Sequence, residues 1–213
     1  MINQPVKRSR KLGKFAGGIL QHAKSLPEGG IISPKEFLHL GMRANVDQAL
    51  SRLAKRGELL RVGRGMYTRP VKTRFGNRPP SSRSVSKAIS QRTGETIVSS
   101  GAVAANALGL STQIPMREVL LTSGRSRTIT LGQRTVELQH TPQWQVREGV
   151  VGTALRALLS MGEHVSERSL SRLWNGLRVS EQKQLQSILG SAPGWLASGI
   201  AKNAQKSKEK SIA

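Results

Sequence analysis

The chain contains no cysteine and very few aromatic residues among its 213 positions. Without cysteine it can form no disulfide bond, no thiolate zinc site and no cysteine nucleophile. Aromatic residues make up only 3% of the chain, so its cores must be built mainly from aliphatic side chains. No apolar run reaches the roughly 18 residues of a membrane-spanning helix, and we find no signal-peptide pattern. We therefore expect no membrane association and a cytoplasmic location.

Acidic residues are also scarce, because 12 Asp and Glu stand against 34 Lys and Arg, for a net charge of +22. Residues 1–80 hold 17 basic and 4 acidic residues, whereas residues 81–213 hold 17 and 8. Such an excess favours polyanionic partners, because a protein that neutralises phosphates releases their counterions. Charge alone allows duplex DNA, RNA or an anionic membrane.

The usual groups of catalysis and metal binding are missing from the sequence. The four histidines are far apart and lack the spacing of metal ligands: His22, His39, His140 and His164. There is no phosphate-binding Gly-x-x-x-x-Gly-Lys-Ser/Thr run and no Asp-x-Asp pair that can hold magnesium. We therefore expect no enzyme activity, no cofactor and no metal site. An enzyme that acts on nucleic acid or nucleotides is the alternative.

Residues 43–69 read as a helix followed by a tight basic hairpin. Val46, Leu50 and Leu53 recur at helical spacing, and Gly57 stands where a glycine typically ends a helix. Residues 59–62 and 66–69 are predicted to be two short strands. Between them, Gly63-Arg64-Gly65 supplies the turn, because glycine readily accepts a positive φ. This order is typical of a winged helix-turn-helix.

Two earlier elements complete the motif. A first helix is expected from about Lys11 to Ser25, with four apolar residues inward: Leu12, Phe15, Ile19 and Leu20. Ser33-Pro34-Lys35-Glu36 is a capping box with proline at the first helical position, and predicts a short helix over Pro34–Leu40. Met42 stands at the expected N-cap position of the next helix, where Ser or Thr is usual, so the sequence does not define the residue at which that helix begins. Residues 1–69 are thus predicted to be a winged helix-turn-helix DNA-binding domain.

The recognition helix and the wing supply the predicted DNA contacts. Arginine pairs well with guanine, and asparagine or glutamine with adenine, so the polar helix face is expected to read base edges. Arg64 at the hairpin tip is expected to reach a phosphate or the minor groove. The alternatives are a solvated helix face and, for Tyr67, packing within the wing. The predicted set is Lys35, Arg43, Asn45, Gln48, Arg52, Lys55, Arg61, Arg64, Tyr67 and Arg69.

The rest of the chain is predicted to be a basic proline-rich linker (70–82), a second domain (83–200) and a flexible basic tail (201–213). Three prolines argue against regular structure in the linker, and its three cations are expected to follow a phosphate backbone. The second domain is expected to be mixed α/β and to end in helices, two of them capped near Ser166 and Ser180. The overall fold class is therefore α+β. Arg125 and Arg127 flank a loop that is either a second basic contact or a solvated turn.

Within that domain, helices are expected over about 84–92 and 102–108, and strands over 96–98 and 118–122. A hairpin is expected around Gly132-Gln133, where polar and apolar residues alternate on both sides. Leucines at helical spacing mark three helices after residue 150, and a last helix is expected over about 193–204.

Two groups of segments resemble a known family. The first is Val-Asp-Gln-Ala-Leu-Ser-Arg-Leu at 46–53 with Arg-Val-Gly-Arg-Gly-Met-Tyr at 61–67. The second is Ser-Gly-Ala at 100–102 with Ala-Asn-Ala-Leu-Gly-Leu-Ser at 105–111 and the hairpin after it. Together they are similar to the AbiEi-type antitoxins, including the DUF6088 group of predicted regulators, over roughly residues 10–190.

This resemblance implies a winged helix that binds its own promoter and represses a toxin–antitoxin operon. It also implies a C-terminal domain that counters a nucleotidyltransferase-like toxin in a type IV-like system. We therefore predict a sequence-specific repressor and antitoxin, whose partners are its promoter DNA and a cognate toxin. The alternative is a basic winged-helix protein that binds structured RNA and has no antitoxin role.

Overall fold

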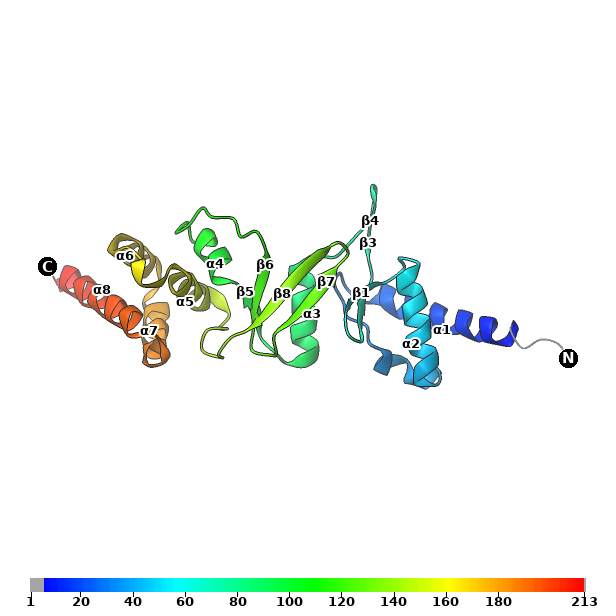
Figure 1. The fold of residues 1–213 in the computed structure, drawn as a ribbon. Helices are drawn as coiled ribbons and strands as arrows, with labels where there is room; N and C mark the ends of the chain where they lie inside the picture. Colours follow the sequence, from blue (N-terminus) through cyan, green and yellow to red (C-terminus); the bar gives the residue numbers. More distant parts are fainter. Residues whose placement is uncertain (1–5, 213) are drawn as a thin grey trace. The chain divides into compact units, whose positions relative to one another are not determined.

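The computed structural model describes residues 6–212, and the side chains of residues 15–163, 165–207 and 209 (Figure 1). The chain divides into two compact units. The first comprises residues up to Glu95 together with Arg127–Glu137, and the second comprises Thr96–Ser126 and the residues from Leu138 onward. The class is α+β, as predicted: N-terminal helices with two small sheets, a four-stranded sheet, and C-terminal helices.

Three helical segments open the first unit: α1 (Val6–Ser25), the 3₁₀ helix η1 (Pro34–Leu40) and α2 (Arg43–Lys55). The capping box of η1 is confirmed, because the Ser33 N–H donates to Glu36 Oε1 (3.0 Å) and the Lys35 N–H donates to Ser33 Oγ (3.3 Å). The helix α1 starts earlier than the predicted Lys11. The predicted recognition helix begins after Met42, which offers it no side-chain cap.

A hydrophobic core joins α1, η1 and α2 to the wing. Phe15 and Ile19 of α1 are buried, as are Val46, Leu50 and Leu53 of α2. Leu20 is partly buried against the same cluster, and the side chain of Leu12 lies outside the described residues. Full burial of a Leu side chain is worth about 1.5–3 kcal/mol. Packing against this core therefore determines which face of α2 is exposed to solvent.

The wing is an antiparallel hairpin of β1 (Leu60–Gly63) and β2 (Met66–Thr68) with Arg64-Gly65 at its tip. Gly65 has a φ of +67°, which the tight turn requires. Ile32, between α1 and η1, pairs with Tyr67: the Ile32 N–H donates to the Tyr67 carbonyl (2.7 Å), and the Tyr67 N–H donates to the Ile32 carbonyl (2.9 Å). Along the chain, α1 is followed by the bridge at Ile32, then by η1, α2 and the β1–β2 hairpin, which is the order of a winged helix-turn-helix.

A second hairpin follows directly, formed by β3 (Val71–Thr73) and β4 (Gly76–Arg78). The interpretation of residues 70–82 as a linker without regular structure is therefore wrong for residues 71–78. The prolines stand outside the paired residues, and Gly76 has a φ of +108° beside the turn. The Thr73 hydroxyl donates to the Gly76 carbonyl (2.8 Å) and accepts from the Phe75 N–H (3.2 Å), which closes the turn.

The helix α3 (Ser82–Thr93) belongs to the first unit, although the sequence placed residues from 83 onward in a second domain. Its N-terminal turn lies so close to Gly29 that a Cβ there would be 2.6 Å from the Ser84 carbonyl carbon. At its other end, Arg92 forms an ion pair with Glu36 of η1. These contacts explain why the boundary falls after α3. The strand β7 (Arg127–Leu131) lies beside β1 in the same unit.

The four-stranded sheet has the order β5-β6-β8-β7, from β5 (Ile97–Ser99), β6 (Glu118–Thr122), β7 and β8 (Arg134–His140). The predicted hairpin turn at Gly132-Gln133 is confirmed. In the second unit, α4 (Gly101–Ala107) packs on α5 (Gly149–Met161), and their approach is close because Ala104, Ala105 and Ala157 are small.

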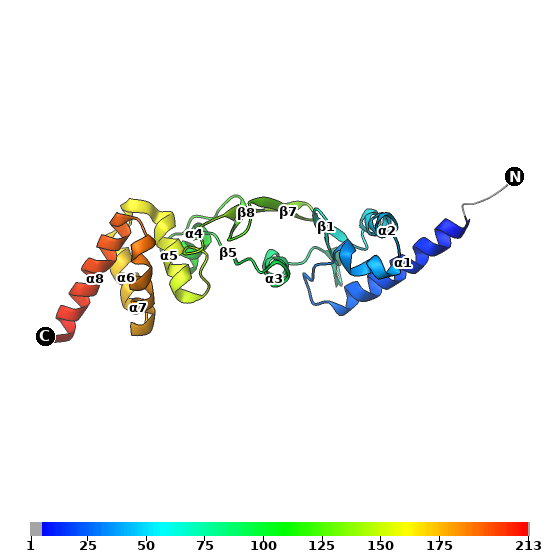
Figure 2. The ribbon, with the colours of Figure 1, turned by 90° about the horizontal axis from the view of Figure 1, so that it is seen from below.

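Figure 2 shows the C-terminal helices gathered together, and they share one core. Leu155, Leu158, Trp174 and Leu185 are buried in it. After α5 come η2 (Gly162–His164), α6 (Glu167–Gly176), α7 (Val179–Ile188), η3 (Leu189–Ser191) and α8 (Gly194–Ile212).

Two expectations for this region are wrong. The helix α7 begins at Val179, so Ser180 does not cap it; the Ser166 cap of α6 is confirmed. The helix α8 continues to Ile212, through the tail that was expected to be flexible. Lys, Gln, Ala and Glu are good helix formers, and α8 is tied to α6, because the Trp174 Nε1–H donates to Ser207 Oγ (3.1 Å).

Candidate nucleic-acid interface

One face of α2 is exposed and polar, and it carries most of the predicted DNA-contacting residues of this helix. Four of them fall at i, i+3, i+7 and i+10, which places them along a single stripe of the helix. All four are exposed, whereas the opposite face is buried in the core. We call this set the reading stripe: Asn45, Gln48, Arg52 and Lys55. The structure thus brings these predicted residues together on a helix held firmly from behind.

Arg43 lies away from the reading stripe. Its Nε–H donates to both carboxylate oxygens of Asp47 (3.0 and 3.1 Å), one helical turn later. Both side chains are about half exposed, so the pair contributes little to stability and can be broken by a phosphate. Arg43 is therefore the member of the predicted set on α2 that already has a partner.

The wing presents its cations as predicted, but not its tyrosine. Arg61 on β1 and Arg64 at the tip are exposed, and Arg69 is half-buried just after β2. Tyr67 is only 7% exposed and belongs to the core of the first unit. Its burial favours the packing role, and we leave it out of the interface.

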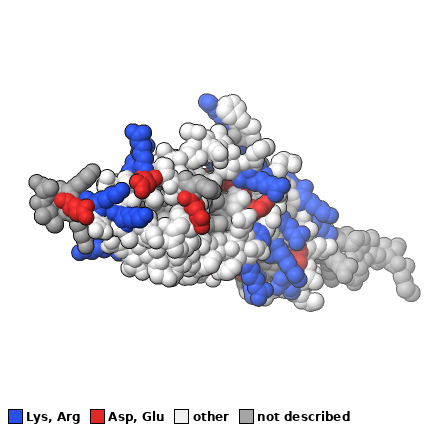
Figure 3. All heavy atoms as spheres, turned by 60° about the vertical axis from the view of Figure 1, so that its left-hand side comes forward, with Lys and Arg blue, Asp and Glu red and all other residues white. Residues whose placement is uncertain are grey.

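The remaining predicted contact, Lys35, is exposed at the start of η1. On the face drawn in Figure 3, Lys and Arg side chains gather over the N-terminal unit, with few acidic side chains among them. The electrostatic footprint of a nucleic-acid-binding protein is such a cluster on one unit.

The second hairpin carries the three cations that sequence reasoning placed in a linker along the phosphate backbone. Lys72, Arg74 and Arg78 are exposed, and Phe75 beside them is 86% exposed. A signal was present: Val71-Lys72-Thr73 suits a strand, and the glycine after Phe75 suits a turn. These cations therefore belong to a hairpin, where the sequence predicted an irregular linker.

Arg127 does not behave as an available cation. Its guanidinium forms an ion pair with Glu95, with Nη1 2.9 Å from Oε2, and the Glu95 side chain is largely buried. Arg125, in the second unit, is exposed between β6 and β7. A second basic contact at this loop stays a prediction, and the ion pair weakens it for Arg127.

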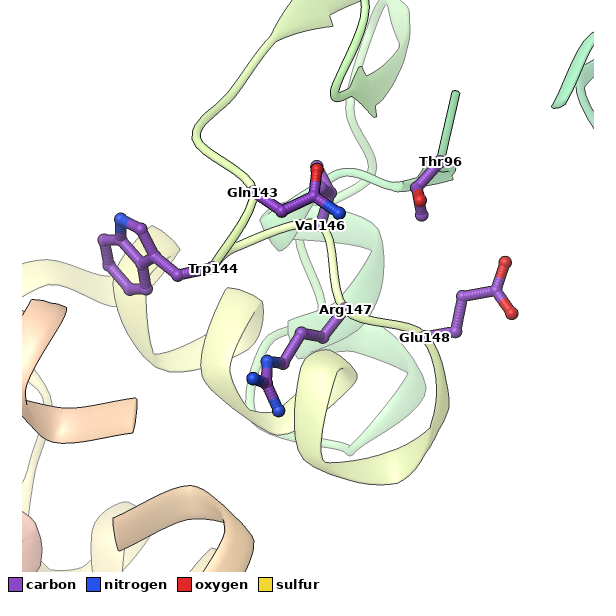
Figure 4. A pocket seen from close by; sticks show the side chains of 6 residues that line it. All are labelled: Thr96, Gln143, Trp144, Val146, Arg147 and Glu148. Atoms are coloured by element: carbon purple, nitrogen blue, oxygen red, sulfur yellow. The ribbon is translucent and has the colours of Figure 1, made fainter. Parts of the chain in front are cut away.

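The second unit carries a surface pocket of about 520 Å³ lined by Thr96, Gln143, Trp144, Val146, Arg147 and Glu148. Figure 4 shows the side chains of Trp144 and Arg147 pointing away from that of Thr96. Glu148 is the one carboxylate among the lining residues, and none of them is a cysteine, serine or histidine.

The loop that lines this pocket is held by a buried arginine. Arg156 of α5 is 4% exposed, and its Nη1 donates to the carbonyl oxygens of Arg147 (2.5 Å) and Gln145 (3.3 Å). Burial lowers the pKa of Arg156, because a charged guanidinium is costly away from water. Arg156 therefore holds the backbone of the pocket loop at Gln145 and Arg147 in place.

Within the described part of the chain, no cluster of three or more His, Asp or Glu is placed to hold a metal ion. The same residues form no helix with the length and apolar character that crossing a membrane requires.

A protein-family model described as a family of unknown function, DUF6088, matches residues 18–185. The matched region runs from α1 into α7, so it includes the reading stripe, both hairpins and most of the second unit. Neither the curated proteins nor the solved structures give a match. Because the family model covers most of its length, the chain belongs to the DUF6088 family.

Proposed function

We propose that this protein binds duplex DNA sequence-specifically and represses transcription from its own promoter. In this proposal α2 lies in the major groove, and the wing and η1 contact the flanking phosphates. The observation that carries the proposal is the reading stripe: four exposed polar or basic side chains on a helix packed from behind, beside an arginine-tipped hairpin.

The dimensions of the stripe suit this role. From Asn45 to Lys55 a helix rises about 15 Å, which spans about four base pairs of B-DNA. Asparagine and glutamine pair with adenine and arginine with guanine, and each good bidentate contact is worth about 1–3 kcal/mol of discrimination. Lys35, Arg61 and Arg64 supply the part of the binding free energy that is independent of DNA sequence and depends on salt concentration.

We further propose that the protein is the antitoxin of a type IV-like toxin–antitoxin pair, in the cytoplasm and without enzyme activity of its own. The similarity of residues 100–111 to AbiEi-type antitoxins supports this. In the structure those residues form α4 and the turn after it, against α5. The partner is a nucleotidyltransferase-like toxin, contacted directly or opposed through its effect.

The DNA proposal is tested by a gel-shift titration with the duplex immediately upstream of the protein's own gene. Scrambled duplex and RNA of the same length serve as competitors at near-physiological salt. Retention of the upstream duplex against both competitors is the expected result. Equal displacement by scrambled duplex would contradict sequence-specific binding, and preferential displacement by RNA would favour the RNA-binding alternative.

The antitoxin proposal needs a separate test. The genes adjacent to this one are expressed singly, and any that arrests growth is then co-expressed with this protein. Restored growth is expected. If an adjacent toxin is found and the protein leaves its toxicity unchanged, the antitoxin role is refuted while the DNA proposal stands.

A further inference from the structure

The β3–β4 hairpin carries an exposed aromatic ring at its tip. Residues 74 and 75 form a two-residue turn between paired Thr73 and Gly76. The Phe75 side chain is 86% exposed, and the Arg74 guanidinium carbon lies 4.6 Å from the centroid of its ring. Figure 1 shows the hairpin standing out from the helices of its own unit. An exposed ring of this size is costly in water, so the tip suits a partner.

The base of the hairpin is fixed to the rest of the first unit. Arg78 donates from Nη1 and Nη2 to the two carboxylate oxygens of Glu28 (3.2 and 3.3 Å), and the Ser81 N–H donates to Glu28 Oε1 (3.1 Å). These hydrogen bonds, first that from Ser81 and then that from Arg78, lower the pKa of Glu28. The base of the hairpin is therefore joined through Glu28 to the segment between α1 and η1.

Its charge identifies the class of partner. Lys72 and Arg74 are exposed beside the ring, and the hairpin residues 71–78 contain no acidic side chain. A ring flanked by cations fits a polyanion with flat apolar surfaces to receive it, which describes nucleic acid. The hairpin follows the wing directly in the sequence, and both belong to the first unit, which carries the proposed DNA interface.

Duplex DNA offers such a projection its minor groove. The groove is about 6 Å wide and bordered closely by phosphates, whereas the wide major groove is taken by α2 in the proposed complex. Apolar side chains of minor-groove proteins enter between base pairs, unstack them and bend the duplex, with nearby cations on the phosphates. A two-residue turn with one ring matches that geometry.

We propose that the β3–β4 hairpin is a second DNA-binding element, which inserts Phe75 into the minor groove beside the site read by α2. Lys72 and Arg74 neutralise the phosphates on either side, and the partial unstacking bends the DNA. This inference rests on the proposed DNA-binding function and extends it to shape recognition, because flexible base steps accept the wedge more readily.

The test compares wild-type protein with Phe75→Ala and Phe75→Trp on the upstream duplex. Binding is measured by fluorescence anisotropy, and bending by energy transfer between dyes at the two ends. Phe75→Ala is expected to bind roughly 5- to 150-fold more weakly and to lose the bend, with an unchanged salt slope. Phe75→Trp is expected to retain both. Ile114→Ala, which removes an equally exposed apolar side chain (87%) from the second unit, is the matched control.

Modified bases separate this inference from the proposed function. Diaminopurine in place of adenine adds an amino group to the minor groove, whereas 7-deazaguanine removes an acceptor from the major groove. Diaminopurine is expected to weaken wild-type binding and to affect Phe75→Ala little, while deazaguanine weakens both. If the wild type binds the upstream duplex specifically, and Phe75→Ala binds and bends that duplex as well as the wild type does, the wedge is overturned while the proposed function stands.

Two other outcomes overturn the wedge. If wild-type protein shows no preference for the upstream duplex, the proposed function fails and the wedge with it. If Phe75→Ala weakens binding to single strands more than to duplex, the ring stacks on unpaired bases. Because Phe75 contributes nothing to the core, the variant is expected to have the wild-type melting temperature, which circular dichroism verifies.

Discussion

Replacing Arg64 by alanine isolates the electrostatic part of DNA binding. The Arg64 side chain is exposed at the tip of the β1–β2 hairpin, and the backbone turn is kept by Gly65. One phosphate contact contributes about 0.9 to the slope of log K against log salt. Its loss is therefore expected to weaken binding about 15-fold at 0.05 M salt and about 4-fold at 0.2 M.

The assay is fluorescence anisotropy with the upstream duplex and a scrambled duplex, over a range of salt concentrations. Arg64→Ala is expected to lose the same factor on both duplexes, because a phosphate contact carries no sequence information. Arg168→Ala, which removes an exposed arginine of α6 in the second unit, is the matched control. An unchanged salt slope for Arg64→Ala would refute the assignment of the wing to the phosphate backbone.

Three further predictions concern folding. Gly152→Ala is expected to destabilise the protein by about 1–3 kcal/mol, because its Cβ would lie 1.9 Å from the Arg147 carbonyl oxygen. Gly17→Ala, with open space around the new Cβ, is expected to raise the free energy of unfolding by up to about 1 kcal/mol. Thermal melting compares the two variants. Leu50→Ala is expected to cost about 2–5 kcal/mol in urea unfolding, because the side chain is fully buried in the core. The pKa of Glu28 in the folded protein lies below its ordinary 4.5, so the ionised carboxylate stabilises the fold fully above pH 4.5, and this stabilisation is lost as the pH falls through the folded-state pKa. The difference in unfolding free energy between wild type and Glu28→Gln is therefore expected to shrink over that pH range. A difference that stays constant would contradict this prediction.

Local patterns predicted α2 and the wing well, because their signals lie within the segment itself. The apolar spacing of Val46, Leu50 and Leu53 determines the buried face, and Gly57 and Gly65 have the positive φ that ends a helix or closes a turn. The capping box at Ser33 is equally local. The reading stripe could therefore be predicted almost completely from sequence.

Features that depend on distant contacts were missed. The base of the second hairpin is held by Glu28, which is 50 positions before Arg78 in the sequence. Prolines near the hairpin suggested a linker, but they flank the paired residues. The burial of Tyr67 depends on its pairing with Ile32, and the length of α8 depends on its hydrogen bond to Trp174. Sequence periodicity carries no information on such pairs.

The central claim is that the reading stripe selects a DNA sequence. The most direct measurement is the ratio of affinities for the upstream and scrambled duplexes, for wild type, Asn45→Ala and Arg52→Ala. We predict a clear preference in the wild type, reduced about 5- to 150-fold in each variant at unchanged melting temperature. Equal binding of both duplexes by the wild type, or an unchanged preference in both variants, would contradict the account.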